Sequence, residues 1–170
     1  MAVTQPYSLP TTAQNPFYVQ YARVDGAMST KKNVISGLGA TRTLLAEESG
    51  SLIILDRAAG IALTLPAPVI GLVFDFLVAV TVTTNAYKII TDAATTFLIG
   101  QYLNVDIDSA NANIVFSADG TTIISLNLAG TTKGGFLGSA FRFTCVSSTL
   151  WLVEGLNNAN GTVVTAFATT

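Results

Sequence analysis

Large hydrophobic residues alternate with small or polar residues in short runs between Gly50 and Thr84. Leu52 to Leu55 is a short apolar run, and Ile61 to Leu65 places its large side chains at every second position. Phe74 to Val82 repeats this spacing over a longer run. A period of two is the pattern of a β-strand that is buried on one face. The stretch therefore predicts two short strands followed by a long one.

The residues between these runs favour turns. Asp56 to Gly60 predicts a tight turn, so that Ile53 to Leu65 would form a hairpin. Pro66 ends the second strand because proline has no N–H for the ladder. The long strand is unusual because its second face, with Val73, Leu77 and Ala79, is also apolar. One face is expected in the core of the domain, and the other against a neighbouring subunit or a covering arm.

Further short strands are predicted along the rest of the chain. Ser117-Ala-Asp-Gly and Ser147-Ser148 predict two more hairpins. The strands are expected over Ala86–Thr91, Thr96–Tyr102, Asn113–Phe116, Thr121–Leu126, Ala140–Val146, Thr149–Val153 and Thr162–Ala168. Turn signals at this spacing are typical of sandwiches and barrels. We therefore predict an all-β fold, a compact antiparallel β-barrel or sandwich that is jelly-roll-like, over residues 50–170 with a short C-terminal strand or tail.

Residues 1–49 have a different character, with several prolines, many polar residues and no clean periodicity. They predict an extended N-terminal arm, held either by a partner surface or by its own domain. Aromatic and basic side chains are the expected anchors, because aromatic residues carry much of the energy of interfaces. The predicted contact residues are Tyr7, Phe17, Tyr18, Tyr21, Arg23, Lys31 and Lys32.

Charged residues make up only 11% of the 170 residues, whereas hydrophobic residues make up 50%. Since a typical domain has roughly 25% charged residues, such a chain enters a membrane or buries surface in an assembly. The most hydrophobic stretch, Ile61 to Val82, contains Pro66, Pro68, Gly71 and Asp75, and its period is not helical. We therefore predict an obligate oligomer and no membrane partner.

The charge and the missing residue types exclude several functions. A net charge of −2 argues against a nucleic-acid partner. The chain has no histidine, which removes Ser-His and Cys-His triads and the usual zinc sites. No phosphate-cradling glycine motif is present either. We expect no catalytic site, no cofactor and no metal, and a buried structural role for Cys145, the only cysteine.

Carboxylates are the remaining candidates for chemistry. Asp75 interrupts an apolar strand, and the favoured interpretation is an outward-facing or interface position paired with an arginine such as Arg142. Asp75, Arg142 and Trp151 are the candidate subunit-interface residues. A carboxylate-based hydrolase is the alternative, and it would need Asp75 and Glu154 on one concave surface. The oxygen-rich run Asp106 to Asn113 fits either loop chemistry or a calcium site, and the loop interpretation is favoured.

Two stretches resemble virion proteins of tailed bacteriophages. The first is Gly-x-Leu-Ile-x-Leu-Asp-x-Ala-x-Gly-Ile-x-Leu-Thr-Leu-Pro-x-Pro-x-x-Gly-Leu-x-Phe-x-Phe, from Gly50 to Phe76. The second, Phe141-Arg-Phe-Thr-Cys-Val-Ser-Ser-Thr-Leu-Trp-Leu-Val, is similar to the closing hairpin of such domains. Head decoration (cement) proteins are the members of this group that the chain most resembles.

The resemblance implies a non-enzymatic β-domain, commonly a homotrimer, on the outer capsid surface of the virion. Such a protein binds the major capsid protein and stabilises contacts between its subunits, and the arm of residues 1–49 suits this role. The alternative is a tail, fibre or spike component that binds host-surface carbohydrate through its loops, for which the Tyr102 to Asn113 loop is the candidate.

Overall fold

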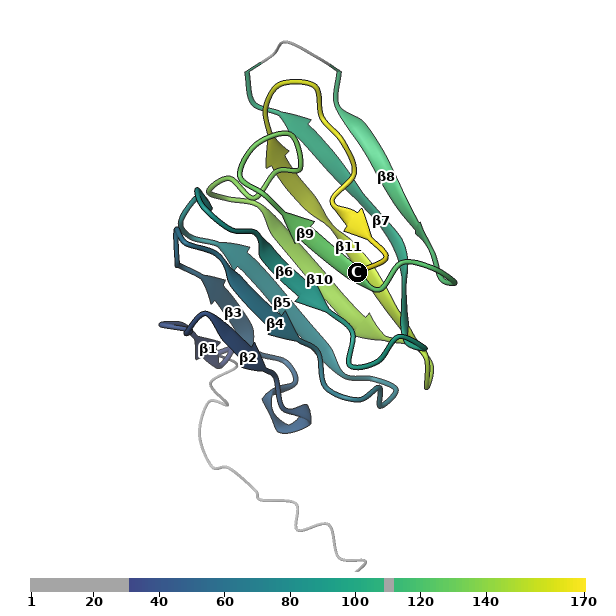
Figure 1. Cartoon of the computed structure of the whole chain (residues 1–170). Helices are drawn as coiled ribbons and strands as arrows, with labels where there is room; N and C mark the ends of the chain where they lie inside the picture. Colours follow the sequence, from purple (N-terminus) through teal and green to yellow (C-terminus); the bar gives the residue numbers. More distant parts are fainter. Residues whose placement is uncertain (1–30, 109–111) are drawn as a thin grey trace, which may run out of the picture. The chain divides into compact units, whose positions relative to one another are not determined.

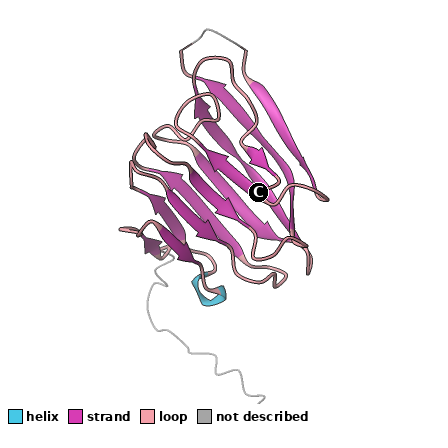
Figure 2. Cartoon of the chain, in the orientation of Figure 1, coloured by secondary structure: helices cyan, strands magenta, loops and turns pink. Residues whose placement is uncertain are grey.

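Residues 31–108 and 112–170, which the computed structural model describes, form two packed β-sheets (Figure 1). The seven-stranded sheet contains, in spatial order, β1 (Val34–Ile35), β3 (Leu52–Leu55), β5 (Val73–Val78), β10 (Ala140–Cys145), β11 (Leu150–Ala159), β7 (Phe97–Asp106) and β8 (Ile114–Asp119). The five-stranded sheet contains β12 (Phe167–Ala168), β9 (Ser125–Leu128), β6 (Tyr87–Ile90), β4 (Ile61–Thr64) and β2 (Thr41–Thr43). The only helical segment in these residues is the 3-10 turn η1 (Ala46–Glu48) (Figure 2). The all-β prediction is therefore confirmed, with a sandwich-like architecture.

The sheets are mixed, so the prediction of a purely antiparallel fold is wrong. From β1 to β6 the chain alternates between the two sheets, and each strand pairs in parallel with the strand two places along. The positions of paired residues show the length of chain in each turn of this winding. Val34 lies opposite Leu52, and Leu52 lies opposite Asp75. Pairing is parallel because each turn of this winding brings the chain back into the same sheet in the same direction. The antiparallel pairs involve β8, β9, β10 and β12.

Two predicted hairpins are instead connections between the sheets. β3 lies in the seven-stranded sheet and β4 in the five-stranded sheet, and β8 and β9 are divided in the same way. Five linking residues can span roughly 16 Å, which is enough for the 10 Å between packed sheets. At the second crossing, hydrogen bonds from Thr122 and Thr121 to the Asp119 carboxylate hold the pKa of Asp119 well below its usual range. The hairpin at Ser147-Ser148 is confirmed as β10 and β11.

The sandwich begins earlier in the chain than Gly50. β1, β2 and η1 all lie in the segment that the sequence assigned to the arm. β1 pairs with β3, and β2 pairs with β4, each over only two or three residues. Such short strands have no visible period in the sequence. Residues 31–49 therefore belong to the edge of the sandwich, whereas residues 1–30 lie outside the described residues.

The core lies between the inner faces of the two sheets and contains most of the large side chains. Phe76 packs edge-on against Phe143, with ring centroids 5.2 Å apart. Trp151 packs against Phe74 at 6.1 Å and is completely buried. Cys145 is buried as predicted, and this burial raises the pKa of its thiol.

Tyr102 of β7 connects the seven-stranded sheet to the C-terminal segment. Its hydroxyl oxygen accepts a hydrogen bond from the Ala166 backbone N–H at 2.7 Å, and its ring lies 5.0 Å from that of Phe167. Only 1% of the residue is exposed, and burial raises the pKa of the phenol. Tyr102 thus places a polar atom inside the core where it satisfies an otherwise buried donor.

Asn157 of β11 organises a buried polar cluster. Its amide nitrogen donates to Asn104 Oδ1 at 2.7 Å and to the Lys133 carbonyl at 3.0 Å. Its Oδ1 accepts a hydrogen bond from Gly135 N at 3.0 Å. Both asparagines are fully buried. The cluster therefore fixes the bend at residues 131–135 against the centre of the seven-stranded sheet.

Candidate functional site

The outer face of the seven-stranded sheet, which points away from the five-stranded sheet, carries a continuous row of apolar side chains. Strand register places one residue from each of six adjacent strands in this row. In order, they are Ile54, Leu77, Ala140, Leu156, Leu103 and Val115. Leu156 and Val115 are each 54% exposed. We call these six residues the apolar row.

A second row of outward side chains is mostly polar. It runs parallel to the apolar row, two residues away along each strand. It consists of Leu52, Asp75, Arg142, Glu154, Gln101 and Ser117, which we call the polar row. Beyond it, the next row is again mostly apolar and contains Val73, Thr144, Leu152 and Ile99, and it ends at the exposed Asp119 of β8. Apart from Asp119 at the β8 edge, the charges in these rows therefore lie in a narrow band between apolar side chains.

Asp75 is the centre of this band. Arg142 Nε donates to Asp75 Oδ1 at 2.7 Å, and Arg142 Nη2 donates to Oδ2 at 3.2 Å. Lys32 Nζ also forms an ion pair with Oδ2. The Asp75 side chain is only 14% exposed, so two cations compensate one half-buried carboxylate. Asp75 and Arg142, which the sequence suggested as partners, thus pair within one chain, and their role at a subunit interface stays a prediction.

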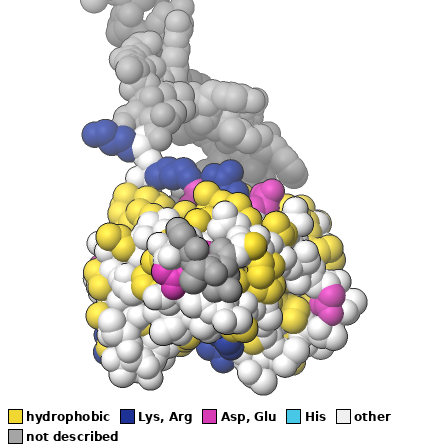
Figure 3. Space-filling model, turned by 90° about the horizontal axis from the view of Figure 1, so that it is seen from above, with side chains coloured by type: hydrophobic (Ala, Val, Ile, Leu, Met, Phe, Trp, Pro, Cys, Tyr) yellow, Lys and Arg dark blue, Asp and Glu magenta, His cyan; other side chains and the backbone are white. Residues whose placement is uncertain are grey.

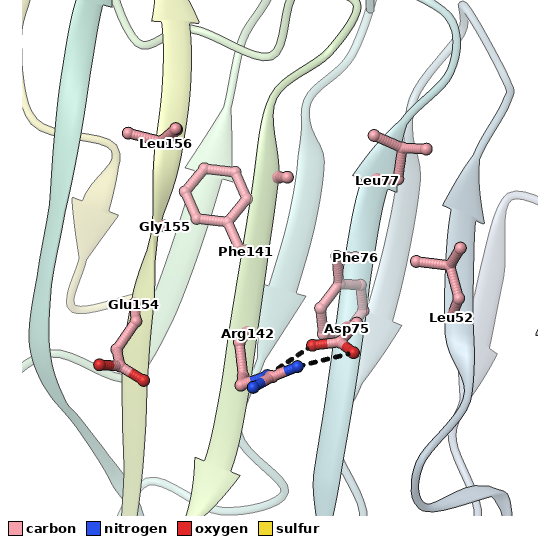
Figure 4. Close-up of a pocket in the computed structure, with 10 residues that line it drawn as sticks. Leu52, Asp75, Phe76, Leu77, Phe141, Arg142, Glu154, Gly155 and Leu156 are labelled. Carbon is pink, nitrogen blue, oxygen red and sulfur yellow. Dashed lines mark hydrogen bonds and ion pairs between the residues drawn. The ribbon is translucent and has the colours of Figure 1, made fainter. Parts of the chain in front are cut away.

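Glu154 lies on the other side of Arg142 in the register, and it is exposed. The Arg142 guanidinium points toward Asp75 and away from Glu154 (Figure 4). No ion pair joins Glu154 to another residue within 31–108 or 112–170. The polar row therefore presents one carboxylate that the described part of the chain leaves without a cation.

A shallow groove of about 570 Å³ runs over the middle of this face. Its lining includes the aliphatic side chains of Leu52, Leu77 and Leu156 together with the three charged residues of the polar row (Figure 4). Asp75 and Glu154 thus lie on one surface, as the hydrolase alternative requires. However, Arg142 stands between them and, with Lys32, holds Asp75 in ion pairs. The arrangement is explained by charge pairing on an apolar surface.

Trp151 is not at the surface, where the predicted role at a subunit interface would place it. Its side chain points inward from β11 and is completely buried among core residues of its own chain. The sequence could not distinguish the two faces of β11, because Leu150 and Leu152 beside it are also large and apolar. In the structure it is these neighbours that face outward.

The predicted arm contacts are only in part described. Lys31 and Lys32 are exposed, and Lys32 reaches Asp75 on the outer face. The other predicted contact residues, Tyr7, Phe17, Tyr18, Tyr21 and Arg23, lie outside the described residues. Their role on a capsid surface stays a prediction.

The described residues of the loop after β7 add no metal site. Asn113 Oδ1 accepts a hydrogen bond from Asp106 N at 2.9 Å, and residues 109–111 lie outside the described part. Within the described residues, no three cysteine or acidic side chains gather as a metal site requires. The described residues contain no helix that is long and apolar enough to cross a membrane. Charged side chains are also sparse at the end of the sandwich that Figure 3 shows.

The apolar row is the feature that sequence reasoning identified only in part. Apolarity on both faces of β5 was visible, but the alignment of six strands was not, because it depends on pairing between distant segments. Comparison of the chain with protein families, curated proteins and solved structures found no match.

Proposed function

We propose that this chain is a non-enzymatic structural protein of a tailed-bacteriophage virion, a head decoration (cement) protein. In this role it binds the major capsid protein on the outer capsid surface, as a homotrimer, and stabilises contacts between coat subunits. The proposal joins the resemblance of the Gly50–Phe76 and Phe141–Val153 stretches to the surface described above.

The single observation that carries the proposal is the outer face of the seven-stranded sheet. Monomeric proteins rarely expose large contiguous apolar patches, and such patches usually mark interaction sites. The apolar row on six adjacent strands, with a second apolar row on four of them, supports this face as a surface for protein contact. The low share of charged residues, 11%, supports an existence within an assembly.

The Gly50–Phe76 stretch also has a definite place in the fold. It provides β3, β4 and the first part of β5, which are consecutive strands of the parallel winding. Leu52 and Asp75 at its two ends are neighbours in the polar row. The residues that carry the resemblance therefore build part of the candidate surface itself.

Capsids of the phage that encodes the chain, prepared without this protein, provide the test. Purified protein is added, the particles are sedimented, and bound copies are counted against the coat protein. Saturable binding at a copy number comparable with that of the coat protein is the expected result. Failure to bind capsids would refute the proposal, and binding to tails or to host glycans would favour the fibre or spike alternative.

A further inference from the structure

We infer that the outer face of the seven-stranded sheet binds a second copy of this chain through the same face, with Glu154 accepting a cation from that copy. This inference goes beyond the proposed function, because a reciprocal contact through one face joins two copies about a two-fold axis and is distinct from the three-fold contact of a homotrimer. Capsid binding would then use another surface of the pair. Three observations support it: the contrast between the two outer faces, the charges of the polar row, and the size of the face.

The two sheets differ in what they present to the outside. Outward positions of the five-stranded sheet are mostly small or polar, and include Thr43, Ala62, Thr64, Lys88, Ile90 and Asn127. Such a face can remain exposed to solvent. The seven-stranded sheet instead presents leucine, isoleucine and valine side chains across adjacent strands. Since only one face has this character, a contact between copies is expected there.

The charges on this face complement each other between copies. Lys32 and Arg142 are both engaged with Asp75, so this site has two cations for one anion. Glu154, one strand away, is the anion without a cation in the described residues. With Asp119 at its β8 edge, the face as a whole has two cations and three anions. A second copy brings a lysine or arginine of this pair to Glu154, and its own Glu154 receives the reciprocal contact, as a symmetric interface requires.

A partner with an unrelated surface would have to supply this cation by coincidence, whereas a second copy always carries it. Reciprocal pairing also leaves neither copy with an uncompensated carboxylate when water is excluded from the groove. An uncompensated buried charge is strongly unfavourable, so the pairing would fix the register between the copies. The charge balance therefore favours a second copy over other occupants.

The face is also large enough. Six strands about 4.8 Å apart, with outward rows about 6.8 Å apart, give a footprint on the order of 500 Å² before side-chain relief is counted. Stable interfaces bury roughly 800 Å² of accessible surface per partner. The groove beside Leu156 adds relief that a side chain of the second copy can fill. The flat footprint is smaller than this area, and with side-chain relief the face is of the same order as a specific interface.

The test measures the mass of the full chain in solution by light scattering over a range of concentrations. Leu156→Glu places a carboxylate in the apolar row, at a position that is 54% exposed in the single chain. It is expected to raise the dissociation constant by about 100-fold or more, because a charge would be buried without a partner. Ile70→Glu is the matched control, since Ile70 is 72% exposed and lies outside this face, in the connection between β4 and β5.

Glu154→Ala is the second variant, because it removes an exposed side chain that has no ion pair within the described residues. It should weaken association by about tenfold or more while circular dichroism stays unchanged. An oligomeric wild type with a dissociated Leu156→Glu variant and an oligomeric Ile70→Glu control would support the inference. A monomeric wild type, or oligomers unaffected by both face variants, would overturn it. Capsid binding is measured separately, so either result leaves the proposed function with its own test.

Discussion

Asn157→Ala is the substitution whose effect on stability can be derived most directly from the structure. Truncation removes three hydrogen bonds and leaves Asn104 Oδ1, the Lys133 carbonyl and the Gly135 N–H without the amide that satisfied them. Each buried polar group without a partner costs about 1–3 kcal/mol. A water molecule that enters the vacated space can satisfy some of them, so we expect a loss of about 3–5 kcal/mol in the free energy of unfolding.

The assay is urea denaturation followed by the emission of Trp151, the only tryptophan of the chain. Because Trp151 is completely buried, its emission should shift to longer wavelength when the core opens. With a urea m-value of about 2 kcal/mol/M, the expected loss lowers the midpoint by about 1.5–2.5 M. Protein concentration must be the same for all variants, since an oligomer is stabilised by mass action.

Asn158→Ala is the matched control on the adjacent residue. The Asn158 side chain donates one hydrogen bond, to the Leu137 carbonyl at 3.0 Å, and is half-buried. Its loss should cost only about 0.5–1.5 kcal/mol. If both alanine variants unfold at the same urea concentration, the buried cluster does not contribute as the geometry implies, and the reasoning from unsatisfied groups fails.

Two further predictions concern the centre of the seven-stranded sheet. Gly100→Ala should be more destabilising than Gly50→Ala by about 1–3 kcal/mol: both glycines have positive φ, but a Cβ on Gly100 would lie 2.4 Å from a carbonyl oxygen of β11, whereas one on Gly50 meets nothing within 4 Å. Equal urea midpoints for the two variants would contradict this. Tyr102→Phe should cost about 1–3 kcal/mol, because the Ala166 N–H loses its acceptor. Burial raises the pKa of Tyr102 above that of an unfolded tyrosine, so its stabilisation is complete below about pH 10 and is lost as the pH rises through the folded pKa. Above about pH 10 the wild-type urea midpoint should therefore fall more steeply with rising pH than that of Tyr102→Phe, and parallel slopes would refute the assignment. The pKa of Tyr87 is also raised by burial, so the midpoint of the variant should still fall, but less steeply.

Local pattern predicted where most strands after Gly50 lie, but not which strands pair. The run from Leu52 to Leu65 has the same alternation whether its halves form a hairpin or cross between two sheets. The distinction depends on β5, which arrives later in the chain and pairs with β3 in parallel. The parallel pairs of the mixed sheets depend on contacts between successive turns of the winding. The pattern within a single segment carries no information about these contacts.

The candidate site was predictable to a similar degree. Asp75 was noticeable because a carboxylate in an apolar strand needs compensation, and Arg142 was a sound partner for it. Lys32 was assigned to a separate arm, since the short strands β1 and β2 leave no periodic signal. Glu154 gained its significance only from the register, which places it one strand beyond an arginine that is already paired.

The position of β10 and β11 has a consequence for how the chain acquires its structure. From β1 to β6, paired strands are only about twenty residues apart in sequence, so successive turns of the winding can form while the chain is still being synthesised. The seven-stranded sheet is different, because β10 and β11 lie between β5 and β7 and are made later than both. Until they are inserted, β5 and β7 expose strand edges at the middle of the future sheet, where unpaired strands are prone to aggregate. A chain that ends before Ala140 would therefore lose the centre of its largest sheet rather than its margin. The candidate surface, which extends across β10 and β11, is completed only by a late part of the chain.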